Sequence, residues 1–165
     1  MVKFADRMNL LKGSAIRELL ALANKPEILS FAGGMPAPEL FPIDKIKAAT
    51  NAVLDEQGQI ALQYSSTNGF EHFRQQIADR MEAKLQIKTS ADNILVTSGS
   101  QQGLDFSARV FVNPGDTVII ESPSYLGALN AFKACEPNFV AIPTDENGMI
   151  MEELEKVLAS DDKVK

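Results

Sequence analysis

The chain has 165 residues, 45% of them hydrophobic and 23% charged, which is enough apolar material for one globular core. Its formal charge of −6 and the lack of any lysine or arginine run argue against nucleic acid or an anionic membrane as partner. A single cysteine, Cys135, excludes a disulfide within the chain, and no apolar run reaches membrane-spanning length.

The first forty residues predict one short helix and one shaped loop. Apolar residues at helical spacing indicate a helix over 14–23, which Lys25 and Pro26 end. An extended run then leads into the segment 33–38, whose two glycines and two prolines are not compatible with regular structure. The N-terminus lacks the apolar region of a signal peptide, so we expect a cytoplasmic protein.

Two longer helices are predicted next. From Ile43 onward apolar residues recur at helical intervals until Gln57 and Gly58 stop the pattern. A second amphipathic helix should occupy 70–85, with Arg74 among the charged residues of its solvent face. The apolar positions of this second helix are Phe73, Ile77, Met81 and Leu85.

Beyond residue 88 strands and helices alternate, which predicts a parallel or mixed sheet covered by helices. The expected strands are 94–97, 117–121 and 139–142. The expected helices are 101–111, 126–135 and 152–158. The charged segment 161–165 looks like the approach to a further strand, so the chain is expected to be truncated and to expose apolar surface unless partners cover it.

The turn Ser98-Gly99-Ser100 joins the first expected strand to a helix. At a helix start the first amides lack intrahelical acceptors and the helix dipole is positive, so the turn is a candidate phosphate site. Gly99 allows the main chain to approach a ligand closely. Serine is also common at such positions for helix capping alone, and this alternative stays open.

Four motifs in order resemble the N-terminal part of fold-type I pyridoxal-phosphate-dependent aminotransferases of class I/II. They are Ser30-Phe31-Ala32-Gly33-Gly34-Met35-Pro36, Gln63-Tyr64-Ser65-Ser66-Thr67-Asn68-Gly69, the segment 93–104, and Glu121-Ser122-Pro123-Ser124-Tyr125. Within this family, the motifs are most similar to those of the 2-aminoadipate aminotransferase-like subgroup. The resemblance implies an α/β fold, a partial three-layer sandwich truncated before its sheet is complete. Residues 1–42 would form an N-terminal arm and substrate loop, and 43–165 the first part of the cofactor-binding large domain.

The resemblance also assigns cofactor-binding residues. Backbone amides of Gly99, Ser100 and Gln101 would hold the phosphate of pyridoxal 5′-phosphate. Tyr125 matches the tyrosine whose ring stacks on the pyridine face. Tyr64 is similar to the tyrosine that reaches the partner subunit's phosphate, so a homodimer is expected. The competing interpretations are an aromatic residue that covers a sheet end for Tyr125 and a surface turn residue for Tyr64.

Two residues match substrate positions. Gly34 matches the loop glycine that lies against the substrate carboxylate. The guanidinium of Arg17 is a candidate to bind a substrate carboxylate bidentately, which hints at substrates whose side chains end in a carboxylate. Turn geometry alone and a solvated arginine are the alternatives. His72 is a lone histidine without a second metal ligand nearby, so no metal site is expected.

The implied activity is transfer of an amino group from an amino acid to a 2-oxo acid, with pyridoxal phosphate as electron sink. No catalytic residue can be assigned in this chain, because lysines such as Lys84, Lys133 and Lys156 lie on amphipathic helices. The Schiff-base lysine of the family would fall after Lys165, so the chain alone is expected to be inactive.

Two other function classes are alternatives. An aminotransferase-like sensory domain of a transcription regulator would need a winged-helix region ahead of residue 14. An unrelated nucleotide-binding module would need a Gly-x-Gly-x-x-Gly or Walker-type turn, which the segment 98–103 does not match.

Overall fold

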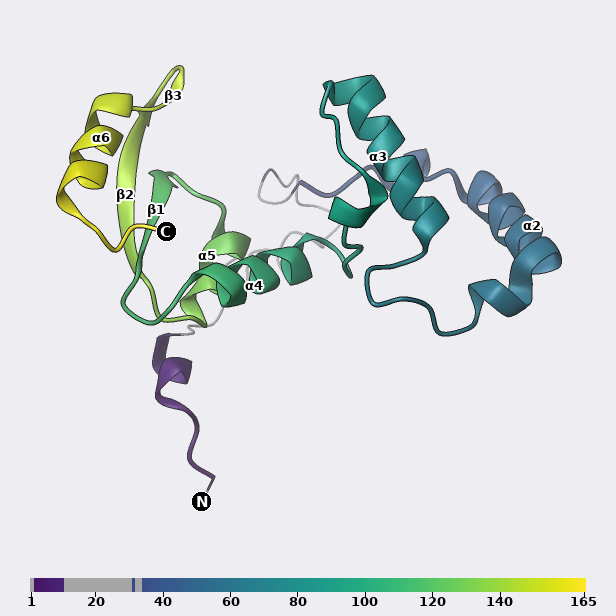
Figure 1. Cartoon of the computed structure of the whole chain (residues 1–165), viewed down its shortest axis with the longest axis horizontal. Coiled ribbons are helices and arrows are strands. Elements are labelled where there is room, and N and C mark those ends of the chain that lie inside the picture. The colour runs from purple at the N-terminus through teal and green to yellow at the C-terminus, as the bar shows by residue number, and fades with distance from the viewer. Residues whose placement is uncertain (1, 11–30, 32–33) are drawn as a thin grey trace. The chain divides into compact units, whose positions relative to one another are not determined.

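The computed structural model describes residues 2–10, 31 and 34–165 of the chain. The chain divides into two units, one formed by residues 1–13 with 97–165 and the other by residues 14–96 (Figure 1). The helix predicted over 14–23 lies outside the described residues, as does most of the extended run that follows it.

Two helices dominate the unit 14–96. Helix α2 spans Ile43–Ala61 and helix α3 spans Glu71–Leu85, as the apolar spacing predicts. Within α2, Gln57 departs from helical geometry with φ −138° and ψ 21°. The end predicted at Gln57 and Gly58 is therefore a kink, after which the helix continues to Ala61.

Short 3-10 helices lie at three places in the described residues. They are η1 at Asp6–Leu10, η2 at Pro38–Leu40 and η3 at Ala91–Asn93. Because proline suits the first position of a helix, η2 begins at Pro38. Regular structure thus starts inside a segment that the sequence predicts to be irregular.

The buried face of α3 differs from the predicted one. Arg74 and Ala78 are 7% and 2% exposed, whereas Phe73 is 48% exposed. Arg74 Nε donates to the carbonyl of Gly69 at 3.1 Å, and its Nη1 donates to the carbonyl of Ala91. The prediction that Arg74 faces solvent is wrong, because these main-chain acceptors offset the cost of removing its guanidinium from water.

The segment 94–97 is extended but is not a strand, contrary to prediction. Within the unit 14–96 this segment contacts the turn that contains Asn68 and Gly69. The amide of Val96 donates to the carbonyl of Asn68 at 3.0 Å. Gly69 in that turn has φ +99°, and a Cβ there would lie 2.7 Å from Val96 Cγ2. Without a neighbouring strand among the described residues, alternation of apolar side chains is not sufficient to form sheet.

The sheet lies in the unit that contains residues 97–165. Strand β1 (Thr117–Ser122) pairs in parallel with β2 (Asn138–Asp145), and β2 pairs antiparallel with β3 (Gly148–Met149). The order is β1-β2-β3. The first two strands occupy the predicted positions, and β3 escaped prediction because two residues carry no periodicity.

Helices cover both faces of this sheet. Helix α6 (Met151–Ser160) lies on one side of β1 and β2, while α4 (Ser100–Phe111) and α5 (Leu126–Lys133) lie on the other (Figure 1). The three helices fall within two residues of their predicted bounds. The predicted α/β layering is confirmed in this partial form.

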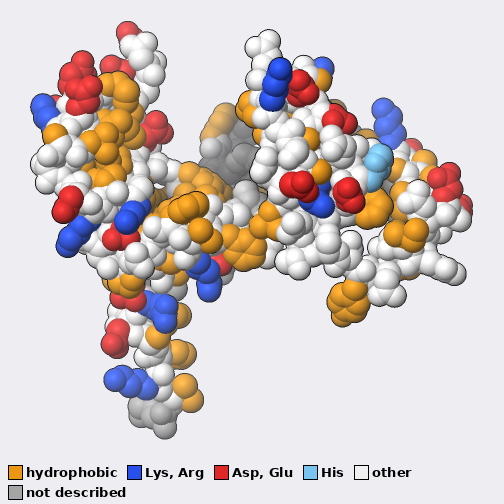
Figure 2. All heavy atoms as spheres, in the orientation of Figure 1, with side chains coloured by type: hydrophobic (Ala, Val, Ile, Leu, Met, Phe, Trp, Pro, Cys, Tyr) orange, Lys and Arg blue, Asp and Glu red, His pale blue; other side chains and the backbone are white. Residues whose placement is uncertain are grey.

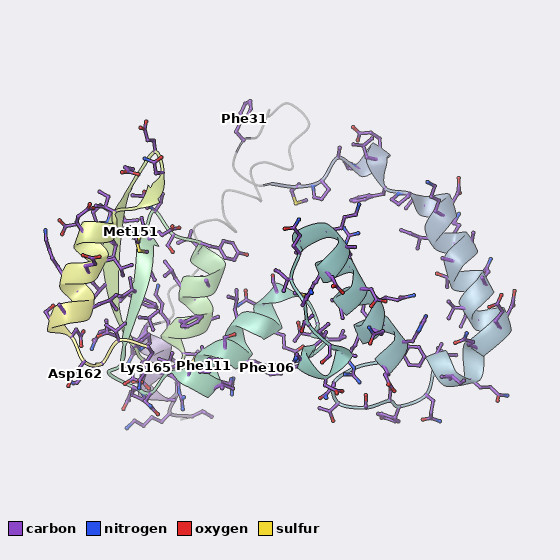
Figure 3. All side chains as sticks on the ribbon, turned by 45° about the horizontal axis from the view of Figure 1, so that its top comes forward. Phe31, Phe106, Phe111, Met151, Asp162 and Lys165 are labelled. Carbon is purple, nitrogen blue, oxygen red and sulfur yellow. The ribbon has the colours of Figure 1, made fainter. Side chains whose placement is uncertain are left out.

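Apolar surface is abundant on both units (Figure 2). The buried hydrophobic residues of the described chain are Ala78, Ala91, Ala108, Val112, Ala131 and Ile142. On α4, by contrast, Val110 and Phe111 are 72% and 68% exposed, and Phe106 projects from the same helix (Figure 3). A cavity of about 270 Å³ also lies between β1 and the helices α4 and α5. The prediction of exposed apolar surface is confirmed.

The last residues lie beside the start of β1. The amide of Thr117 donates to Lys163 at 2.9 Å, and the amide of Lys165 donates to Thr117 at 3.0 Å, which forms a parallel bridge to Val164. Thr117 Oγ1 also donates to Asp161 Oδ2 at 2.6 Å. This bond, with the amide and charge of Lys163, lowers the pKa of Asp161. The segment 161–165 thus begins to pair with β1.

None of the helices in the described part of the chain combines the length and apolarity needed to cross a bilayer.

Candidate functional site

Helix α4 begins after a tight turn that carries no capping side chain. Gly99 is the residue before the helix, and its φ of +78° is a conformation that glycine adopts without steric cost. A Cβ on Gly99 would meet nothing within 4 Å, so backbone conformation rather than lack of space favours glycine here.

The polar groups of this turn pair with one another. The amide of Gly99 donates to the carbonyl of Thr97 at 2.9 Å, and Thr97 Oγ1 donates to the carbonyl of Gly99 at 3.0 Å. The amide of Ser98 donates to Gln102 Oε1 at 2.6 Å. The Gly99 amide, which the family resemblance assigns to the phosphate site, already donates to Thr97 inside the turn.

The next three amides differ from those of the turn. Those of Ser100, Gln101 and Gln102 find no acceptor among the residues that the structure describes. At a helix start such amides lie at the positive end of the helix dipole. Neighbouring donors of this kind suit an anion such as phosphate.

The start of α5 adds an aromatic ring to this site. The ring of Tyr125 lies over Gly127, where a Cβ would come within 2.6 Å of its Cε1 and Cζ atoms. Gln101 Nε2 lies 3.5 Å from the carbonyl of the same glycine, at the limit of a hydrogen bond. The first turns of α4 and α5 therefore lie together, and the Tyr125 side chain, 67% exposed, is open to a ligand.

This donor set fits pyridoxal 5′-phosphate. The unpaired amides of α4 suit a doubly charged phosphate, and an exposed aromatic face suits a planar pyridine ring. The residues that carry these amides are uncharged serine and glutamine, so none of them adds a carboxylate that would repel the anion.

The other predicted site residues lie outside the unit that contains α4 and α5. Tyr64 and Gly34 belong to the unit 14–96, where Tyr64 is 99% exposed and a Cβ on Gly34 would meet nothing within 4 Å. Arg17 lies outside the described residues. The structure thus brings together Gly99, Ser100, Gln101 and Tyr125.

Two residues of the site escaped sequence reasoning. Gln102 carries the acceptor for the Ser98 amide, and Gly127 provides the space for the Tyr125 ring. A glutamine at the third residue of a helix is a known capping signal, and this signal could have identified Gln102 from the sequence. Gly127 follows an aromatic residue by two positions, which is not a signal in itself.

A larger hollow in the unit 14–96 is a weaker candidate. It measures about 440 Å³ between α2 and α3, and Val53, Ile60 and Phe73 are among its lining residues. None of the predicted site residues lines it. His72 borders it, with Nε2 3.2 Å from Gln76 Nε2. The described ranges contain no group of three or more histidine, cysteine, aspartate or glutamate side chains arranged to hold a metal.

Comparison with known proteins places these features in a family context. The family model for aminotransferase class I and II matches residues 32–165. The aromatic-amino-acid aminotransferase 1 of Thermococcus litoralis is 46% identical over 155 residues, which cover 94% of this chain and 37% of that protein.

A solved structure and a more distant relative extend the comparison. The α-aminoadipate aminotransferase of Thermus thermophilus, solved with N-(5′-phosphopyridoxyl)-L-leucine, matches with a TM-score of 0.82 and 40% identity over 96% of this chain and 38% of that one. An uncharacterized HTH-type transcriptional regulator of Escherichia coli, YdcR, is 30% identical over 144 residues, or 87% of this chain and 31% of the regulator. The chain thus spans less than two fifths of the length of these proteins.

Proposed function

Because the chain belongs to the aminotransferase class I and II family, we propose that the whole protein is a pyridoxal-phosphate-dependent aminotransferase, which transfers an amino group from an amino acid to a 2-oxo acid. The observation that carries this proposal is the set of unpaired amides at the start of α4, together with the exposed ring of Tyr125 at the start of the neighbouring helix α5. The phosphopyridoxyl compound in the Thermus thermophilus relative supports the same class of cofactor here.

The amides of Ser100 and Gln101 bind the cofactor phosphate, and the amide of Gln102 is available to the same anion. The helix dipole contributes about 0.3–2 kcal/mol to such binding, depending on burial. The hydroxyl of Ser100 is exposed at the same turn and adds a donor. Gly99 contributes its backbone shape, because its own amide is held by Thr97.

Tyr125 stacks on the cofactor ring and keeps water from that face. When bound, the cofactor supplies an electron sink for the carbanion that forms as the substrate loses its Cα proton. This chemistry also needs a lysine, an acidic partner for the pyridine nitrogen and an arginine for the substrate α-carboxylate. These three roles have no assigned residue in this chain, and we assign them to other parts of the whole protein.

The unit 14–96 contributes contacts to the substrate and to the partner subunit. The amide of Gly34 donates to the substrate carboxylate, and Arg17 pairs with a carboxylate of the substrate. Tyr64 extends to the phosphate of the partner subunit in a homodimer, a role supported by its almost complete exposure. Residues 1–42 act as arm and substrate loop, and residues 43–165 as the first part of the cofactor-binding domain.

Replacing Ser100 with proline tests the proposal. Proline removes the amide donor but is tolerated at the first position of a helix, and the extended ψ of 173° at Gly99 is compatible with a following proline. In the whole protein we expect Ser100→Pro to weaken pyridoxal phosphate affinity by about 10- to 100-fold, the effect of one lost hydrogen bond to an anion. Ser100→Ala, which keeps the amide, should weaken it less.

The measurement is a titration of the purified whole protein with pyridoxal phosphate, followed by absorbance, together with an assay of amino transfer. A wild-type protein that neither takes up the cofactor nor transfers an amino group would refute the proposal.

A second candidate function is the aminotransferase-like domain of a transcription regulator, which the similarity to YdcR favours. In that case the same site binds cofactor without turnover. Cofactor uptake combined with specific DNA binding and no amino transfer by the whole protein would identify it.

A further inference from the structure

We infer that the side chain of Gln102 is a positioning residue for the cofactor phosphate, because it holds the turn before α4 in the shape that leaves the following amides free. The inference rests on the proposed function. It assigns a role to a residue that acts through its neighbours, since its side-chain oxygen points to the turn and accepts from Ser98.

The hydrogen bonds of the turn divide its donors into two groups. Upstream, the amides of Ser98 and Gly99 are satisfied by Gln102 Oε1 and by the carbonyl of Thr97. Downstream, the amides of Ser100 and Gln101 have no acceptor within the described part of the chain. The Gln102 side chain links the two groups of donors, because it belongs to helix α4 and accepts a hydrogen bond from the turn.

Without Gln102 the turn has an alternative that would occupy the phosphate donors. Serine is among the preferred capping residues, and a Ser98 hydroxyl turned towards the helix would accept from the amides that follow. The structure records no side-chain cap on α4, so this bond is not made while Gln102 holds the Ser98 backbone. Gly99, which lacks a Cβ, gives the turn the freedom to rearrange once that constraint is lost.

The test compares pyridoxal phosphate with pyridoxal, which lacks the phosphate. In the whole protein, Gln102→Met should weaken pyridoxal phosphate binding by about tenfold, the equivalent of one hydrogen bond, and leave pyridoxal binding unchanged. The double variant Ser98→Ala with Gln102→Met should recover part of that loss, because the competing cap is removed. Gln75→Met is the matched control, since Gln75 is an exposed glutamine that bonds to Asp79 at 2.8 Å, away from the turn.

The outcomes separate this inference from the proposed function. If the wild-type protein prefers pyridoxal phosphate to pyridoxal and Gln102→Met keeps that preference, the positioning role is refuted and the proposed function stands. An equal loss for both ligands also refutes it, because a general structural effect does not depend on the phosphate. A wild-type protein without any preference refutes the phosphate site itself, and the role of Gln102 with it.

Discussion

Gly127 is the residue on which the position of the Tyr125 ring depends. The ring occupies the space that a side chain at Gly127 would need, with its Oη 2.7 Å from the position of a Cβ. Since the Tyr125 side chain is two-thirds exposed, a clash is relieved by swinging the ring into solvent rather than by moving α5. A substitution at Gly127 therefore changes the position of the Tyr125 ring without a loss of stability in α5.

We predict that Gly127→Ala weakens cofactor binding without destabilising the fold. Alanine is favoured over glycine in a helix by about 1 kcal/mol, so the free energy of unfolding should stay level or rise. Pyridoxal phosphate affinity should fall by about tenfold because the stacking ring is displaced. Cofactor titration and thermal unfolding of the whole protein measure the two effects. Gly58→Ala in α2, where a Cβ meets nothing within 4 Å, is the control and should leave affinity unchanged.

At the scale of elements, Arg74 connects α3 to two segments that surround it. Its guanidinium donates to Gly69 in the preceding turn and to Ala91 in η3, and it is almost fully buried. Both acceptors are main-chain carbonyls, and no carboxylate within the described ranges forms an ion pair with it. The arginine thus fixes the turn that follows Tyr64 and the start of the segment that leads to α4.

We predict that Arg74→Met lowers the free energy of unfolding by about 2 kcal/mol, because the replacement leaves buried carbonyls without their charged donors. Arg74→Lys should recover only part of this, since an ammonium group does not reproduce the two-directional geometry of a guanidinium. Urea unfolding measures the change. Arg80→Met, at an exposed position of the same helix, should change stability little, and an equal effect of the two methionine variants would contradict the role of Arg74.

The elements that sequence reasoning predicted well are those that local periodicity defines. Helices α2 to α6 and the strands β1 and β2 lie where apolar spacing and turn residues indicate them. The segment 94–97 was predicted wrongly because strand formation depends on a partner, and partners are not visible in local sequence. Arg74 was placed on the wrong face for a similar reason. Its burial depends on the carbonyls of Gly69 and Ala91, which only the fold brings within reach.

The candidate site was predictable to the level of a turn but not of its individual atoms. The motif Ser98-Gly99-Ser100 indicated an anion site at the start of a helix, and the structure shows unpaired amides there within the described residues. Which amides stay free is decided by bonds inside the turn, including the Gln102 side chain, and spacing alone does not reveal those bonds. The positions of Tyr64, Gly34 and Arg17 relative to this turn stay predictions.

At the scale of the whole molecule, the exposed apolar surface and the exposed Tyr64 favour an assembled protein. Large hydrophobic side chains are open to solvent on α2 as well as on α4, for example Ile43, Ile60 and Val110. Such surface is characteristic of interaction sites. The matched relatives are more than twice as long as this chain.

A subunit-mixing experiment tests whether Tyr64 acts across a dimer. In a two-fold dimer with crossed sites, each site combines Ser100 of one subunit with Tyr64 of the other. A Tyr64→Ala homodimer and a Ser100→Pro homodimer should then both be defective. In a hybrid dimer, however, one site receives both intact residues and the other receives both substitutions.

We predict that mixing the two variants restores about a quarter of wild-type amino transfer, because roughly half of the random dimers are hybrids and each hybrid has one intact site. Co-expression with two different tags isolates the hybrid, whose activity should approach half that of the wild type. Mixing either variant with itself is the control and should restore nothing. If Tyr64 instead serves its own subunit, every site in the hybrid carries one substitution, and activity stays at the level of the defective homodimers.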